Sequence, residues 1–190
     1  MLSEMVDYQR RPISVDEFDR MYDARILLDE RLELIDGDIV VPPPMGPPHA
    51  GGIVRLDGLL QSRLFGRATV RCQCPLPLLP RSEPLPDFVI ARYDRDCYSK
   101  RHPKPEEVLW LIEVGHKTRR YDRETKLPLY ARYRIPEVWL LDLVERKLSV
   151  AREPNDVGYS RIVTLGEGDV VQLTAFPDVS FAVADLLGLA

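Results

Sequence analysis

Hydrophobic and polar positions follow two different periods along this chain, and each period predicts one type of element. Ile53, Leu56, Leu60 and Leu64 recur at helical spacing, which predicts an amphipathic helix over residues 49–64. Short apolar runs bounded by polar or proline-rich segments predict buried strands instead. Both patterns occur within the same stretch of chain, so the expected fold class is α/β.

Five of the predicted strands lie in the centre of the chain. They cover residues 68–74, 76–79, 87–92, 108–114 and 138–143. A helix is expected between the last two, over about residues 120–134, and Pro128 should kink or divide it because proline removes one backbone hydrogen bond. A strand, a helix and a second strand over this distance form a crossover, so the two strands should be parallel.

The N-terminal part of the chain carries two local signals. Ser14 and Glu17 form an S-x-x-E capping box, which predicts a helix over about residues 15–24. Asp36-Gly37 is a hairpin signal between two short alternating segments. Residues 1–12 are expected to form a loose arm.

The C-terminal third repeats short alternating segments. Residues 148–152, 159–165 and 170–173 are predicted to form an antiparallel extension, and residues 182–187 a final helical turn. The complete prediction is a mixed sheet flanked by helices, with antiparallel C-terminal strands.

Length and composition narrow the class of protein. A chain of 190 residues favours a single domain over residues 1–190. Hydrophobic residues make up 45% and charged residues 29%, as in ordinary soluble proteins. There is no apolar run of about 18 residues and no signal-like N-terminus, so we expect no membrane span and a cytoplasmic location.

The net charge is −4, which argues against a protein that coats nucleic acid without sequence preference. This net charge does not exclude an enzyme that has a local basic cleft. Arg119, Arg120, Arg123 and Lys126 form a basic segment that follows Glu113. This segment is either such a cleft or a solvated helix face, and the sequence leaves both interpretations open.

Two carboxylates stand at the ends of predicted strands. Glu113 continues the apolar run Val108–Ile112, where a charged group loses hydration unless a metal ion, a cation or backbone donors compensate. Asp87 begins a strand directly after Pro86, although a turn aspartate is the simpler interpretation for it alone. Two acids at strand ends with a lysine nearby suggest a divalent-metal phosphodiester site.

Three further residues are candidates. Lys126 lies on the predicted crossover helix, from which it could reach the end of the Glu113 strand or remain a surface lysine. Glu33 faces either solvent or a cleft, because its neighbours point to the opposite side of the hairpin. His49 stands at the start of a helix, where capping or packing is the commoner role.

These segments, in this order, resemble a known family, the Uma-type putative restriction endonucleases of the PD-(D/E)xK phosphodiesterase superfamily. The resemblance covers roughly residues 13–187 and is most specific over residues 111–142. It rests on Leu32-Glu-Leu-Ile-Asp-Gly37, Pro48-His49, Glu83-Pro-Leu-Pro-Asp87, Leu111-Ile-Glu-Val114, residues 118–131 and Ile135-Pro-Glu-Val-Trp-Leu-Leu-Asp142.

The resemblance implies a restriction-endonuclease-like core and hydrolysis of DNA assisted by Mg²⁺ or Mn²⁺. By carry-over, Asp87 and Glu113 would bind the metal, and Glu33 would be a further catalytic acid. The superfamily's usual lysine position, two residues after the glutamate, is Gly115 here. The resemblance instead implies Lys126 as the catalytic lysine, with Lys117 as the alternative.

His49, Arg119 and Arg120 are the candidates for binding substrate, although His49 could instead contact a carboxylate. The expected partner is DNA; a homodimer is left open. Two other interpretations remain at this stage: a non-catalytic binding module that keeps the fold, and a hydrolase of small phosphodiesters. The DNA target and the biological role do not follow from the sequence.

Overall fold

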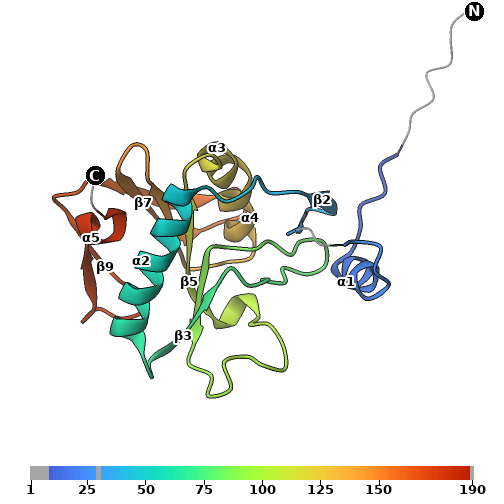
Figure 1. Cartoon of the computed structure of the whole chain (residues 1–190), viewed down its shortest axis with the longest axis horizontal. Helices are drawn as coiled ribbons and strands as arrows, with labels where there is room; N and C mark the ends of the chain where they lie inside the picture. Colours follow the sequence, from blue (N-terminus) through green and yellow to red (C-terminus); the bar gives the residue numbers. More distant parts are fainter. Residues whose placement is uncertain (1–8, 29–30, 189–190) are drawn as a thin grey trace, which may run out of the picture.

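A six-stranded mixed sheet lies between helices in the computed structural model, which describes residues 9–28 and 31–188 (Figure 1). The strand order is β3-β4-β5-β6-β7-β8. The bounds are β3 (Ala68–Cys72), β4 (Phe88–Arg92), β5 (Val108–Gly115), β6 (Glu137–Asp142), β7 (Lys147–Pro154) and β8 (Tyr159–Leu165). The pair β5–β6 is parallel and the other pairs are antiparallel, which confirms the predicted crossover and fold class.

Side-chain alternation sends each strand's residues to two separate cores. On one face, Phe88 and Ile112 pack with residues of α2 (Pro47–Leu64) and α5 (Val183–Leu187). On the other face, Val89 and Leu111 pack with residues of α4 (Leu127–Arg132). Asp87 and Glu113 have the same parity as Val89 and Leu111, so both belong to the α4 side of the sheet.

The helical crossover between β5 and β6 consists of three consecutive segments. It begins with α3 (Arg119–Tyr121), widens into the π-helical segment η2 (Asp122–Lys126) and continues as α4. A short 3₁₀ helix, η1 (Pro105–Glu107), precedes β5. The helix is therefore neither broken nor uniform: the wider π turn lies just before Pro128, whose ring and missing N–H disfavour an ordinary α turn there.

The N-terminal predictions agree with the structure. Ser14 and Glu17 form both bonds of the capping box at the start of α1 (Val15–Asp23). The hairpin joins β1 (Glu33–Ile35) and β2 (Asp38–Val40) at Gly37, which has a φ of 87° and lies against Pro12 too closely for any side chain. Most of the predicted loose arm, residues 1–8, lies outside the described residues; residues 9–12 have no regular secondary structure.

Two strand predictions need correction. Residues 76–79 do not form a strand, and only a single bridge joins Leu78 to Ser82. The prolines in this segment lack the N–H that a ladder requires. Residues 170–172 form β9 (Val170–Gln172), but β9 pairs with β10 (Ser180–Ala182) in a separate two-stranded sheet and does not extend the main sheet.

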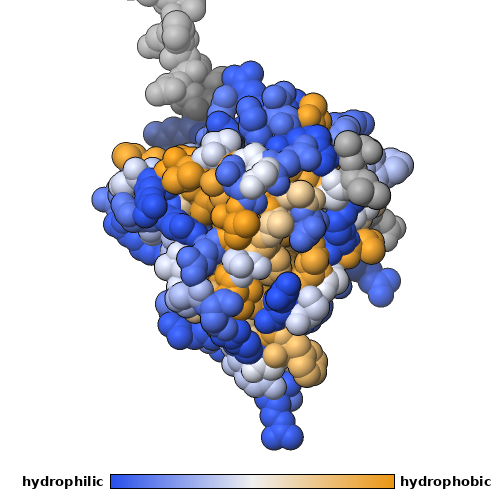
Figure 2. All heavy atoms as spheres, turned by 90° about the vertical axis from the view of Figure 1, so that its left-hand side faces the viewer, coloured by the Kyte–Doolittle hydropathy of each residue, from blue (hydrophilic) through white to orange (hydrophobic). Residues whose placement is uncertain are grey.

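One side of the molecule, at the end where α5 lies, has an apolar surface in its middle, surrounded by hydrophilic residues (Figure 2). α1 and β2 lie at the opposite end (Figure 1). Among the described residues, no helix combines the length and the apolar character that a membrane span requires.

Candidate active site

Asp87 and Glu113 are cross-strand neighbours at the edge where β4 begins and β5 ends. They lie one step beyond the pair Phe88–Ile112. The amide of Val114 donates to Asp87 Oδ2 at 2.8 Å, and the amide of Asp87 is 3.4 Å from Glu113 Oε2. Their exposed fractions are only 8% and 2%. The antiparallel register thus brings two buried carboxylates together at one end of the sheet, although the roles expected for them remain predictions.

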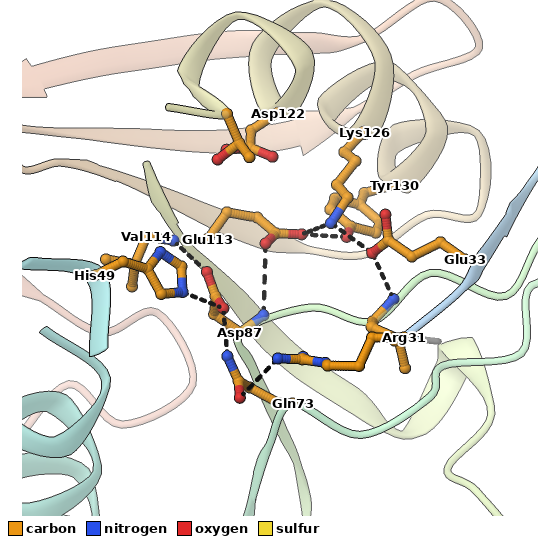
Figure 3. A network of polar contacts seen from close by, with 12 residues as sticks. Arg31, Glu33, His49, Gln73, Asp87, Glu113, Val114, Asp122, Lys126 and Tyr130 are labelled. Atoms are coloured by element: carbon orange, nitrogen blue, oxygen red, sulfur yellow. Dashed lines mark hydrogen bonds and ion pairs between the residues drawn. The ribbon is translucent and has the colours of Figure 1, made fainter. Parts of the chain in front are cut away.

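Lys126 contacts Glu113 of this pair and Glu33 of the N-terminal hairpin (Figure 3). Its Nζ lies 3.3 Å from Glu113 Oε1 and 2.8 Å from Glu33 Oε1. The side chain is buried, with 6% exposed. Lys117 lies in the loop before α3 and is exposed. Of the two lysines considered from the sequence, Lys126 is the one whose ammonium group contacts Glu113.

Glu33 faces the interior of this site and not the solvent. It lies on β1 and is 2% exposed. Its Oε1 also accepts a hydrogen bond from the amide of Leu85 at 2.8 Å. The hairpin therefore supplies a third carboxylate from a part of the chain that does not belong to the main sheet.

His49 approaches Asp87 from the start of α2. Its Nε2 donates to Asp87 Oδ1 at 3.1 Å, and Gln73 Nε2 donates to the same oxygen at 3.2 Å. Arg31 in turn donates from Nη1 to Gln73 Oε1 at 3.3 Å. A chain of polar contacts thus links the exposed Arg31 to the buried Asp87 (Figure 3). Neither Gln73 nor Arg31 was predicted as a site residue.

Sequence reasoning also missed Asp122 and Tyr130. Tyr130 Oη donates to Glu113 Oε1 at 2.5 Å, and Asp122 Oδ2 accepts from Thr118 Oγ1 at 2.7 Å. Both residues are buried: Tyr130 is 0% exposed and Asp122 is 4% exposed. Asp122, Lys126 and Tyr130 recur at intervals of four, which is the one signal in the sequence that could have placed all three on the same helix face.

Burial dominates the electrostatics of the site. Burial raises the pKa of Glu113 to about 8; Lys126 opposes this rise, and the neighbouring acids add to it. Burial likewise raises the pKa of Asp122 to about 6, again against Lys126. Burial disfavours the charged form of Lys126, but the surrounding carboxylates outweigh it and raise the pKa of the ammonium group. The site therefore buries more carboxyl groups than its one lysine can compensate, and the raised pKa values of Glu113 and Asp122 reflect this.

The pKa of His49 is raised as well. The hydrogen bond to Asp87 is the main cause, and burial opposes it. The imidazole therefore keeps its second proton, and its positive charge, up to a higher pH than an ordinary histidine.

A cavity of about 390 Å³ opens onto these groups. Glu33, Asp87, Glu113, Asp122 and Lys126 contribute its acidic floor. The segment 41–46 forms one wall, and residues 116–118 lie on the lining as well. The cavity thus joins a charged floor to a wall that is largely apolar.

Arg119 and Arg120 lie away from this cavity. Arg119 pairs with Asp142 at 3.2 Å, and Arg120 forms an exposed pair with Glu124 at 2.8 Å. Both line a second cleft of about 360 Å³, which shares Glu113 and Asp122 with the first. The two arginines are engaged by acids on or near their own helix, so any contact of theirs with substrate would be made from this second side.

The residues present suit a hard divalent cation. Mg²⁺ is commonly bound through one or two carboxylates together with water and substrate phosphate. In the described part of the chain, no three His, Cys, Asp or Glu side chains form a ready metal cage. Asp87 and Glu113 offer instead a neighbouring pair of buried oxygen donors beside an open cavity, which is the open type of site that such ions occupy.

Comparisons with known proteins give a family for this chain and a structure with a similar fold. The family model described as Uma2, putative restriction endonuclease, matches residues 15–184. A crystal structure of a putative nuclease belonging to DUF820 from Anabaena variabilis has a similar fold, with a TM-score of 0.69 and 17% sequence identity. The alignment covers 93% of this chain and 98% of that one. A search of curated proteins gave no match.

Proposed function

The chain belongs to the Uma2 family of putative restriction endonucleases, and on that premise we propose that the cavity is the active site of a metal-dependent endonuclease that hydrolyses DNA phosphodiester bonds. One observation carries the proposal. A buried ammonium group, that of Lys126, lies between two carboxylates beside a third, Asp87, and a solvent-accessible cavity opens onto all of them.

Asp87 and Glu113 would hold Mg²⁺ or Mn²⁺. When bound, such an ion polarises the phosphoryl oxygen and lowers the pKa of coordinated water. The backbone amide of Val114 and the side chains of His49 and Gln73 orient the Asp87 carboxylate. The Tyr130 hydroxyl does the same for Glu113. These contacts keep both acids in place at the open end of the sheet.

Lys126 would stabilise the negative charge that develops on the phosphoryl group, or orient the attacking water. Its ammonium group is positively charged because Glu33 and Glu113 lie within ion-pair distance. Glu33 would act through Lys126, by fixing the position of the ammonium group. In this scheme Glu33 is a positioning residue and Lys126 is the catalytic cation.

The direct test is cleavage of supercoiled plasmid with Mn²⁺ or Mg²⁺. We expect nicking or linearisation by the wild type, none by Asp87→Ala, and wild-type activity for Glu106→Gln, which removes an exposed acid away from the cavity. A folded wild type that cleaves neither plasmid nor single-stranded DNA with either ion, or an Asp87→Ala variant that cleaves as fast, would contradict the proposal.

The same samples separate the other two functions. A hydrolase of small phosphodiesters would cleave bis(p-nitrophenyl) phosphate in a metal-dependent way and leave plasmid intact. A non-catalytic binding module would bind DNA and cleave neither plasmid nor bis(p-nitrophenyl) phosphate. Neither result is expected if the cavity is the active site of an endonuclease.

A further inference from the structure

We propose that the cavity takes an unpaired strand of DNA, with a base against the apolar wall at residues 41–45 and neighbouring phosphates held by Arg31 and Lys117. This inference rests on the proposed nuclease function and concerns its substrate class. It arises from the asymmetry of the cavity: acids and one lysine lie at the floor, and a continuous apolar segment stands beside them.

The wall consists of Val41, three successive prolines and Met45, all of which line the cavity. Val41 is 63% exposed and Met45 is 42% exposed, so their apolar surfaces have few partners within the chain. Proline fixes its own φ angle, and a run of three prolines is therefore stiff. A stiff apolar surface can bind the flat face of a base with little loss of conformational entropy.

Exposed cations border the same cavity. Arg31 and Lys117 both line it, and both are exposed. Arg31 is held toward Asp87 through Gln73. Phosphates on either side of a base at the wall would meet these cations, while the scissile phosphate lies at the floor. The charge pattern is thus complementary to a short stretch of backbone.

The form of the cavity favours a strand over a duplex. The acids that would act on the phosphate are at most 8% exposed, and they lie at the floor of a cavity of about 390 Å³. In a duplex, the bases face inward and are paired, so none is free to lie on an apolar wall beside the backbone. A single strand presents both its phosphates and its base faces. The net charge of −4 also agrees with a short footprint that uses few phosphate contacts.

Fluorescence anisotropy with the wild-type protein and Ca²⁺ tests the wall directly. The probes are a labelled 12-nucleotide strand, the same strand with its central four bases removed, and the blunt duplex. We expect the intact strand to bind on the order of tenfold more tightly than either other probe, the size of one base contact. Equal or tighter binding of the duplex overturns the inference.

A double variant, Val41→Ser with Met45→Ser, should bind the intact and the abasic strands equally well. The matched control is Val157→Ser with Val170→Ser, which removes two residues that are 86% and 62% exposed but do not line the cavity. It should keep the wild-type preference for the intact strand. A Val41/Met45 variant that still prefers the intact strand to the same degree would show that the wall does not contact bases.

Salt dependence tests the cations. Two phosphate contacts give a slope of log K against log salt of about −1.4 for a single strand, and Lys117→Ala should reduce it by about 0.7. Lys100→Ala, which alters an exposed lysine outside the cavity, should leave the slope unchanged. An unchanged slope in Lys117→Ala counts against the placement of phosphates at the rim.

Cleavage with Mn²⁺ keeps this inference separate from the proposed function. Cleavage of the strand or of a flap in preference to the blunt duplex supports both. Preferential cleavage of the duplex supports the nuclease and overturns the strand inference. Strand-selective binding without any cleavage supports the wall and contradicts the nuclease.

Discussion

Lys126 on the crossover helix forms an ion pair of 2.8 Å with Glu33 on the N-terminal hairpin, and both side chains are almost completely buried. The pair joins two segments that lie far apart in the sequence, and it also brings the ammonium group to Glu113 at 3.3 Å. A buried pair of this kind is costly to break, because the remaining partner keeps its charge without compensation. The contact therefore links the stability of the fold to the proposed catalytic site.

The first prediction concerns stability. Lys126→Met leaves Glu33 and Glu113 without their cation, and we expect a loss of roughly 3 kcal/mol in the free energy of unfolding. Adding Glu33→Gln should restore part of this loss, because one of the unpaired charges is removed. Urea denaturation of the wild type, both single variants and the double variant gives the coupling energy. Strictly additive effects would mean that the pair does not interact energetically.

A second prediction separates the two lysines by activity. Lys126→Ala should abolish DNA hydrolysis while Mn²⁺ still binds, because Asp87 and Glu113 are unchanged. Lys117→Ala should keep turnover at saturating substrate, since its exposed side chain would contact only a flanking phosphate. Calorimetric titration with Mn²⁺ and plasmid cleavage measure the two properties. Full activity in Lys126→Ala would remove the lysine from the mechanism.

Metal ions should stabilise the folded protein. If only the folded state binds the ion, an ion concentration of about 100 times the Kd raises the free energy of unfolding by about 2.7 kcal/mol. Millimolar Mn²⁺ should therefore raise the Tm of the wild type, and Asp87→Asn should respond less. Without metal, Asp87→Asn should be no less stable than the wild type, because it removes one of several mutually repelling acids. A wild-type Tm that does not change with Mn²⁺ would favour the binding-module interpretation.

The raised pKa of Glu83 should make the stability of the protein depend on pH. Burial, reinforced by Asp19, raises its pKa from 4.5 to about 7 in the folded state. Between those values Glu83 keeps its proton in the folded protein but has lost it in the unfolded chain. The contribution of Glu83 to the free energy of unfolding is therefore fully present below pH 4.5 and is lost as the pH rises toward 7.

Glu83→Gln should remove this loss. Relative to the wild type, the variant should gain roughly 2 kcal/mol at pH 8 and almost nothing at pH 4.5. The exposed control Glu106→Gln should show no such difference. Urea denaturation of the three proteins across this range measures it, and a Glu83→Gln gain that is independent of pH would exclude a shifted carboxyl group as the cause.

Local sequence patterns were sufficient to predict many of the helices, turns and strands. The capping box of α1, the turn at Gly37 and the helical spacing of α2 depend on near neighbours, and all three occur as predicted. The parallel pair of β5 and β6 followed from the length of the crossover between them. Asp87 and Glu113 could be identified as candidate site residues from the sequence, because a charged group at the end of an apolar run loses hydration on burial. That pattern of residues can be seen without the structure.

The remaining site residues depend on contacts between distant segments. From the sequence alone, Glu33 could equally be a surface acid, and only its contact with Lys126 on η2 places it in the site. The positions of Arg119 and Arg120 on the second cleft likewise depend on contacts that the sequence does not show. Asp122 and Tyr130 are buried because the crossover helix packs on the sheet and because η2 widens before Pro128.

The sequence by itself thus determined which elements form and where a carboxylate interrupts an apolar run. The tertiary structure decided which charges neutralise one another. Compensation of a buried charge requires a partner within a few ångströms, and that distance is set by the packing of segments, not by their spacing along the chain.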